Sequence, residues 1–302
     1  MIVAFLEAMR FGLKSKVDLK LRNLRFLEEI PRICYNSQTN KLLEMKMTTK
    51  TKSRCQILNR EWLKVLAMLF MVFDHAYMTV VNVAGYGWMT QIGRIAFPIF
   101  AFEIAEGYIH TSDKSKYLRN MLIFALISEI PYNLMMGGEI IGPFHQNVMF
   151  TFWLALAFLK LIDKVLARSF HLAIKVICIA GICVLSVITG TIAFVDYSGF
   201  GVLTVLIFYL AKLMPKKYIE MAVQFVGLWY INWVCLGGKV LIFPNGFEFP
   251  EQGLALLSLV FIWLYNGKKS LTGKSEKAFK YFCYWFYPGH ILLLSFIALY
   301  LI

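Results

Sequence analysis

Long apolar runs fill most of this sequence, and they restrict the chain to one class of fold. Each run holds about 20 residues, the length that an α-helix needs to cross a bilayer. They make 59% of the chain hydrophobic and leave only 16% charged. A soluble core of this length would not need such blocks. The sequence therefore predicts an all-α, polytopic integral membrane protein with about nine transmembrane helices, within a range of eight to ten.

The positions of these helices follow from the apolar runs. We expect them at residues 62–82, 92–110, 117–136, 147–166, 171–193, 199–214, 218–238, 251–266 and 279–302. The sixth and eighth of these predicted helices are the shortest, and they account for the range in the number of spans.

Basic residues alternate between the connecting segments, which gives an orientation. At least three Lys or Arg occur in each of segments 111–119, 160–175, 212–217 and 268–280. Neither residue type occurs in segments 83–91, 137–146 and 190–198. By the positive-inside rule we expect a multi-pass protein of the cell membrane, with the N-terminus and all basic loops cytoplasmic. An odd number of spans then places the C-terminus outside.

The first 60 residues form a basic tail, which holds 13 Lys or Arg and five acidic residues. We interpret it as the cytoplasmic flank of the first span. Nucleic-acid binding is not expected, because no recognition motif accompanies these charges. Residues 1–46 form no span, so we expect this extension to be dispensable, and Met47 could be the true start. Residues 61–302 would then form the membrane domain.

Cysteine spacing argues against structural metal or disulfide chemistry. The six cysteines show no CxxC or zinc-like spacing, and most lie in apolar runs. A thiol in such surroundings behaves as a small hydrophobic group. We therefore expect neither a metal site nor a disulfide framework.

Asp74 and His75 lie together inside the first predicted span. An ionisable group at bilayer depth costs about 2.5–3.5 kcal/mol on insertion scales, so it usually lines a cavity, pairs or does chemistry. A neutral imidazole can take a proton from an amine or hydroxyl, which makes His75 a candidate general base. The alternative is a histidine satisfied by an interhelical hydrogen bond. Adjacent helical side chains diverge by about 100°, so Asp74 is poorly placed to orient His75.

The second predicted span carries a polar stripe. Glu103, Glu106 and His110 have i, i+3 and i+7 spacing and share one helical face. They could relay protons, bind a cation, or form salt bridges with Arg94 or a basic residue elsewhere. Arg94, at the outer boundary, could bind a phosphate or carboxylate, or it could snorkel or pair with Asp74.

Proline and loop residues supply the remaining candidates. Pro131 should bend or end the third span, because it removes a backbone donor. Asn147 follows His145 and Gln146 before the fourth span, and Asp196 opens the segment before the sixth; either could be functional or an ordinary loop residue. In the last span, Pro288 and Gly289 should distort the turn that presents His290, as part of a site or as a simple kink.

Six ordered segments of the sequence closely resemble the TraX family of membrane proteins. They read MVFDHAYM, IGRIAFPIFAFEIAEGYIHT, KYLRNMLIFALISEIPYNLM, HQNVMFTFWLAL, DYSGFGVLTVLIFY and YWFYPGHILLL. The resemblance runs from about residue 60 to the C-terminus and does not cover residues 1–46.

The resemblance implies an acyltransferase, since the family is named for a conjugation-pilus factor that acetylates the N-terminal amine of pilin. It also implies acetyl-CoA as the acyl donor and an acceptor that is a peptide, a glycan or a lipid. The positions that it implies are Asp74, His75, Arg94, Glu106, Asp196 and His290. We assign a catalytic role to His75, Asp74, Glu106 and His290, and substrate binding to Arg94, Asp196 and Asn147.

Two other functions are compatible with the residues alone. A proton-coupled secondary transporter could use the polar stripe of the second span as its relay, although the sequence shows no internal repeat. A non-catalytic membrane scaffold would use none of these groups.

Overall fold

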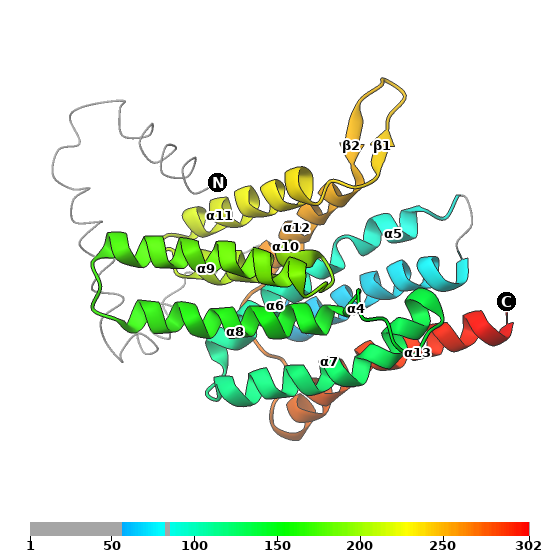
Figure 1. Cartoon of the computed structure of the whole chain (residues 1–302), viewed down its shortest axis with the longest axis horizontal. Coiled ribbons are helices and arrows are strands. Elements are labelled where there is room, and N and C mark those ends of the chain that lie inside the picture. The colour runs from blue at the N-terminus through cyan, green and yellow to red at the C-terminus, as the bar shows by residue number, and fades with distance from the viewer. Residues whose placement is uncertain (1–55, 82–84, 302) are drawn as a thin grey trace. The chain divides into compact units, whose positions relative to one another are not determined.

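The computed structural model describes residues 56–81 and 85–301. Most of these residues are helical (Figure 1). The basic tail, Met47 and the boundary at residue 46 lie almost wholly outside the described residues, so those expectations stay predictions. The all-α class is confirmed for the part that the structure describes, apart from one small hairpin of two strands.

The elements follow in chain order. They are α4 (Arg60–Ala76), the π-helix η1 (Tyr77–Val81), α5 (Trp88–Gly93), α6 (Ala96–His110), α7 (Lys114–Gly137), α8 (Val148–Ala167), α9 (Leu172–Ile192), α10 (Ser198–Lys212), α11 (Lys217–Trp229), the π-helix η2 (Tyr230–Cys235), β1 (Val240–Ile242), β2 (Glu248–Pro250), the 3-10 helix η3 (Glu251–Leu257), α12 (Ser258–Leu264) and α13 (Gly273–Leu301).

Every predicted apolar run contains a helix. Among the described residues, three helical stretches are long and apolar enough to span a bilayer: Arg60–Val81, Leu172–Ile192 and Gly273–Tyr300. Helices α6 and α10 have 15 residues each. At 1.5 Å per residue such a helix covers about 22 Å, less than the hydrocarbon thickness of about 30 Å. The apolar helices therefore indicate membrane association.

Three local features differ from the sequence prediction. Of the two outcomes predicted for Pro131, a bend or an end of the helix, the end is wrong: α7 continues to Gly137 and stops where Gly138 adopts a left-handed φ of 69°. A short helix, α5, occupies part of the expected loop before the second span. The segment after η2 folds into the hairpin β1–β2. Strands of three residues are too short to produce a recognisable alternation in the sequence.

The chain divides into two compact units. The described part of the smaller unit, residues 160–184, holds the end of α8 and residues 172–184 of α9. Inside it, Lys175 Nζ donates to the carbonyl of Leu166 at 2.9 Å. This bond ties the start of α9 to the end of α8.

In the larger unit, residues 53–159 and 185–302, the central element is α6. It packs against α4, α10 and α12, and most of its side chains are buried. A helix whose side chains are buried around most of its circumference belongs in the interior of a bundle. Phe102 shows this, because its ring meets those of Phe208 and Tyr265 edge-on at 5.6 Å each. Helix α13 packs on α7, where Phe124 stacks on Tyr284 at 4.7 Å.

Candidate active site

A cavity of about 330 Å³ lies within the larger unit, at one end of α4 and α7. Its polar lining comes from separate parts of the sequence: Asp74, His75, Arg94, Tyr132, His145, Asp196, Tyr197, Gln252 and Tyr287. The volume is at the small end of the range for ligand pockets. It is suited to a small reacting group rather than to a whole cofactor.

His75 is held by a second histidine, His290 of α13. His75 Nδ1 lies 2.8 Å from His290 Nε2, and the two rings are nearly parallel, at 4°. His290 Nδ1 lies 2.7 Å from the carbonyl oxygen of Phe286. A carbonyl can only accept, so Nδ1 of His290 carries the proton and, in the neutral ring, Nε2 accepts. His75 Nδ1 must then be the donor, which leaves its Nε2 as a basic nitrogen at the cavity.

Two π-helical segments adjoin the cavity lining. His75 is near the end of α4, directly before η1, and its carbonyl accepts from Thr79 Oγ1 at 2.6 Å. Helix η2 likewise ends beside Leu236, which lines the cavity. Widened π-turns are frequent at functional sites. His290 itself does not line the cavity, so it acts on any reaction there through His75.

Asp74 points to other partners, as the divergence of neighbouring side chains predicts. Its Oδ1 accepts from Thr90 Oγ1 at 2.5 Å, and Thr90 Oγ1 accepts from Arg94 Nη2 at 3.0 Å. Arg94 Nε lies 3.5 Å from Glu251 Oε1. The guanidinium therefore lies between two carboxylates, one contacted directly and one through a hydroxyl.

Gly93 explains how α5 approaches Asp74 so closely. A Cβ at this position would lie 2.3 Å from the Cβ of Asp74. A larger residue would displace the carboxylate or α5. The glycine therefore allows α5 to come close enough for the hydrogen bonds that link Arg94 through Thr90 to Asp74.

The segment before α10 brings Asp196 and Tyr197 to the cavity with an unusual backbone. Phe194, Tyr197 and Ser198 all have φ values between 49° and 58°, a region that L-residues adopt sparingly and that is often found at functional sites. Asp196 N donates to the Gln146 carbonyl at 3.0 Å. Burial raises the pKa of the Asp196 carboxyl to about 6, so it can exchange a proton near neutral pH.

His145 lines the cavity, although its position in the sequence does not distinguish it from an ordinary loop residue. Its Nδ1 is hydrogen-bonded to the hydroxyl of Tyr132, and the two rings stack at 5.5 Å. The pairing between Gln146 and Val195 carries the loop toward Asp196. A histidine between two predicted spans was the available signal, but its partner in α7 is not adjacent in sequence.

Comparison with known proteins identifies the chain's family. Residues 59–298 match the family described as "TraX protein". The chain belongs to the TraX family. It is also 27% identical over 241 residues to the "Probable fimbrial assembly protein FimC, serogroup H1" of Dichelobacter nodosus, in an alignment that covers 77% of this chain and 92% of that protein. No solved structure matches the chain significantly. The TraX match includes every residue of the cavity lining.

Asn147, assigned to substrate binding from the sequence, does not line the cavity of this TraX protein. It is completely buried, and its amide nitrogen donates to Ala125 O at 2.9 Å and to Glu129 Oε2 at 2.5 Å. Its Oδ1 accepts from Met149 N at 3.0 Å. These contacts are those of a helix cap at the start of α8.

Glu106 is also outside the cavity, and the structure favours the salt-bridge interpretation of its stripe. Glu106 Oε2 pairs with Lys212 Nζ at 3.0 Å, and its Oε1 lies 3.3 Å from His110 Nε2. Glu103 Oε2 lies 3.6 Å from Lys64 Nζ. The partners are thus basic residues of α4 and α10 and not Arg94.

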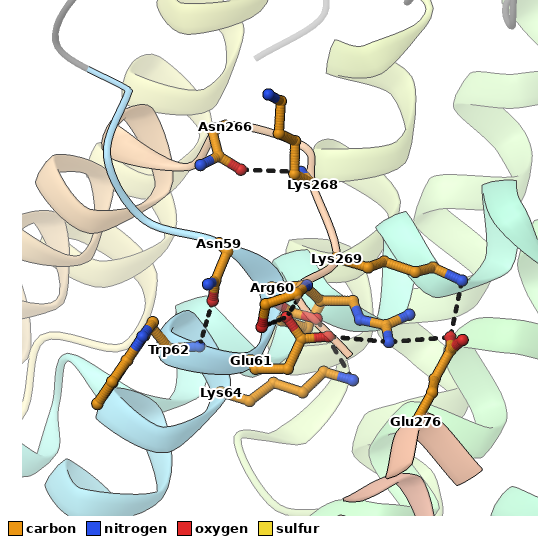
Figure 2. A network of polar contacts seen from close by, with 11 residues as sticks. Asn59, Arg60, Glu61, Trp62, Lys64, Asn266, Lys268, Lys269 and Glu276 are labelled. Atoms are coloured by element: carbon orange, nitrogen blue, oxygen red, sulfur yellow. Dashed lines mark hydrogen bonds and ion pairs between the residues drawn. The ribbon is translucent and has the colours of Figure 1, made fainter. Parts of the chain in front are cut away.

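A further ion network joins the first turns of α4 and α13 (Figure 2). Arg60 Nη2 contacts Glu61 at 3.2 Å and Glu276 at 3.0 Å, and Lys269 Nζ contacts Glu276 at 2.8 Å. His75 is 15 residues beyond Arg60 in the same helix, which corresponds to about 22 Å. The network and the cavity are therefore at opposite ends of α4.

In the part of the chain that the structure describes, no group of three or more His, Cys, Asp or Glu side chains could hold a metal ion. Among the described cysteines, Cys178, Cys235 and Cys283 have free thiols. The chemistry available at the cavity is that of imidazole, carboxylate, guanidinium and phenol groups.

Proposed function

We propose that this TraX family protein is an integral membrane acyltransferase that transfers an acetyl group from acetyl-CoA to an amine or hydroxyl acceptor on a peptide, a glycan or a lipid.

 The observation that carries the proposal is the basic Nε2 of His75 at the cavity, left there by the bond from its Nδ1 to His290. Among the described residues, Nε2 has no hydrogen-bond partner. That is the state a general base needs.

The proposed reaction is a direct transfer. His75 Nε2 accepts the proton of the acceptor N–H or O–H while the acceptor atom attacks the thioester carbonyl carbon. The carbon–sulfur bond then breaks, and the departing thiolate takes the proton from His75. General base catalysis of this kind contributes about 10²–10⁴-fold to a rate.

The other cavity residues have supporting roles in this proposal. Arg94 lies at the cavity and carries a charge that can stabilise the carbonyl oxygen as it becomes negative. Asp74 fixes Arg94 through Thr90. Asp196, whose pKa burial raises to about 6, can bind an ammonium or exchange a proton with the acceptor. His290 is a positioning residue that sets the tautomer of His75.

The proposal includes a topology of nine crossings with a cytoplasmic N-terminus and an external C-terminus. It places His75 toward the outside, so the acyl group of a cytoplasmic thioester must reach about 22 Å from the Arg60 end of α4. Reporter fusions at Ser115, Lys216 and Thr272 should indicate the cytoplasm, and one at Gly138 the outside. A cytoplasmic signal at Gly138 would rule out the nine-span arrangement.

A proton-coupled transporter is the main rival, because buried carboxylates of α6 could carry protons. The observation against it is that Glu103 and Glu106 already have lysine partners, Lys64 and Lys212. The FimC relative is described as a probable fimbrial assembly protein, which is compatible with modification of an assembling polypeptide.

Purified protein in nanodiscs, incubated with acetyl-CoA labelled in the acetyl group, separates these functions. We expect labelled acceptor and free CoA to form in equal amounts when an extract of the native membrane supplies acceptors. Substrate flux into proteoliposomes without CoA release would support the transporter. The absence of both acyl transfer and substrate flux would indicate a scaffold. Either result, flux without CoA release or no activity at all, would contradict the proposed transfer.

A further inference from the structure

The hairpin β1–β2 has a free edge beside the cavity. Its register pairs Val240 with Pro250 and Ile242 with Glu248. Backbone bonds from Phe243 N to Phe247 O, at 2.9 Å, and from Glu251 N to Lys239 O, at 2.8 Å, mark the hydrogen-bonded pairs of this ladder. In an antiparallel ladder such pairs alternate with pairs whose N–H and C=O groups face away. Val240 and Ile242 are therefore the positions of β1 whose backbone groups face outward.

The two edges of the hairpin differ in what they can bind. The outer edge of β1 presents N–H and C=O groups at both Val240 and Ile242. The outer edge of β2 has Pro250 at the corresponding position, which carries no N–H. In the described part of the chain, the sheet contains only these two strands. An unpaired strand edge is a template for pairing with another extended chain, and here only β1 offers a complete one.

Side chains of the hairpin divide between a packed face and an exposed one. Phe249 packs against Trp233 with ring centroids 4.9 Å apart, which fixes the hairpin on η2. On the opposite face, Val240 is 46% and Ile242 74% exposed; at the tip, Phe243 and Phe247 are 46% and 52% exposed. The hairpin thus presents apolar side chains next to unpaired backbone groups.

Lipid hydrocarbon does not fit this surface. Open sheet edges do not occur in the hydrocarbon region, because their backbone groups would lose hydrogen bonds. Lys239, Asn245 and Glu248 of the same hairpin are exposed as well. An extended polypeptide matches both the unpaired backbone groups and the exposed apolar side chains of the hairpin. Its backbone can pair with the edge of β1, and its own side chains can pack against the apolar side chains.

The chain segments that flank the hairpin on both sides reach the cavity. Leu236 and Gln252 both line the cavity, and they lie four residues before β1 and two residues after β2. Four extended residues span at most about 13 Å. A peptide strand on β1 therefore has one end, beside Val240, within a few residues of His75's cavity.

We infer that the outer edge of β1 docks an extended segment of a polypeptide acceptor by strand addition, so that the end of this segment enters the cavity. The inference rests on the proposed function for its reaction, but the docking itself is a binding property.

The test compares prolines at one register position on the two edges. Ile242→Pro removes the outward N–H of β1, and Glu248→Pro removes its counterpart on β2; neither N–H belongs to the β1–β2 ladder. The probe is a twelve-residue peptide of alternating Val and Thr with a fluorophore at its C-terminus, bound to protein in nanodiscs and measured by anisotropy. We expect Ile242→Pro to weaken binding about 10-fold and Glu248→Pro to change it less than about 2-fold.

A second measurement does not depend on the folding of any variant. The same peptide, N-methylated at alternate residues, cannot complete the ladder and should bind the unmodified protein about 10-fold more weakly. Equal binding of the two peptides would overturn the docking inference, as would equal binding by the two proline variants. Attachment of the hairpin to lipid vesicles without peptide binding would also overturn it. Peptide docking without acyl transfer to any acceptor would contradict the proposed function alone.

Discussion

The His75→Ala variant should insert and fold normally but lose acyl transfer by about 10²-fold or more. The substitution removes a polar group from an apolar helix, so insertion should not suffer. It also removes the nitrogen that faces the cavity while leaving His290 bonded to the carbonyl of Phe286. The measurement is the initial rate of CoA release per folded protein, with folding checked by thermal unfolding in detergent.

His171→Ala is the matched control for this variant. His171 is exposed at the start of α9, outside the cavity and outside the TraX-like segments, so its loss should leave the rate unchanged. His290→Ala should lower the rate less than His75→Ala, because it frees the tautomer of His75 without removing the base. Near-normal transfer by His75→Ala together with complete loss in His290→Ala would place the base on α13 instead.

The helices could be predicted because their signal is local. Each apolar run is long enough to identify without knowledge of its neighbours. The structure begins α13 at Gly273, six residues before the predicted start, because the basic first turns of that helix lie outside the apolar run. Helix α5 and the hairpin were missed because six-residue helices and three-residue strands carry too few positions for a periodic pattern.

The site was partly predictable because polar groups in apolar helices are costly. That argument selected Asp74, His75 and Arg94, and the structure brings all three to one cavity together with Asp196. The cost of burial alone could not tell a charged residue that lines the cavity from one that is paired inside the bundle, since either environment can compensate a buried charge. Glu106 is the example, because its partner Lys212 is 106 positions away in sequence.

Loop residues were harder to assign, since their roles depend on tertiary contacts. His145 is positioned by its hydrogen bond with Tyr132 and by the pairing of Gln146 with Val195. Asn147 could have been assigned as a cap from sequence, because an asparagine directly before a predicted helix is a frequent N-terminal signal. Glu251 reaches Arg94 only because the hairpin returns the chain to the cavity.

The most direct test of the central claim is to fill the cavity. Met136 of α7 lines the cavity and is 45% exposed, whereas Ile140, four residues later, is 64% exposed and does not line it. Each position is changed to cysteine in a protein whose six native cysteines have been replaced by alanine. The CoA-release rate is then measured before and after reaction with a bulky maleimide.

If the cavity hosts acyl transfer, the adduct on Met136→Cys should lower the rate at least about 10-fold, because it displaces the acceptor from His75. The adduct on Ile140→Cys should leave the rate unchanged, and saturating acetyl-CoA should slow labelling of Met136→Cys only. Undiminished transfer by fully labelled Met136→Cys would contradict the account, because the reaction would then take place outside this cavity.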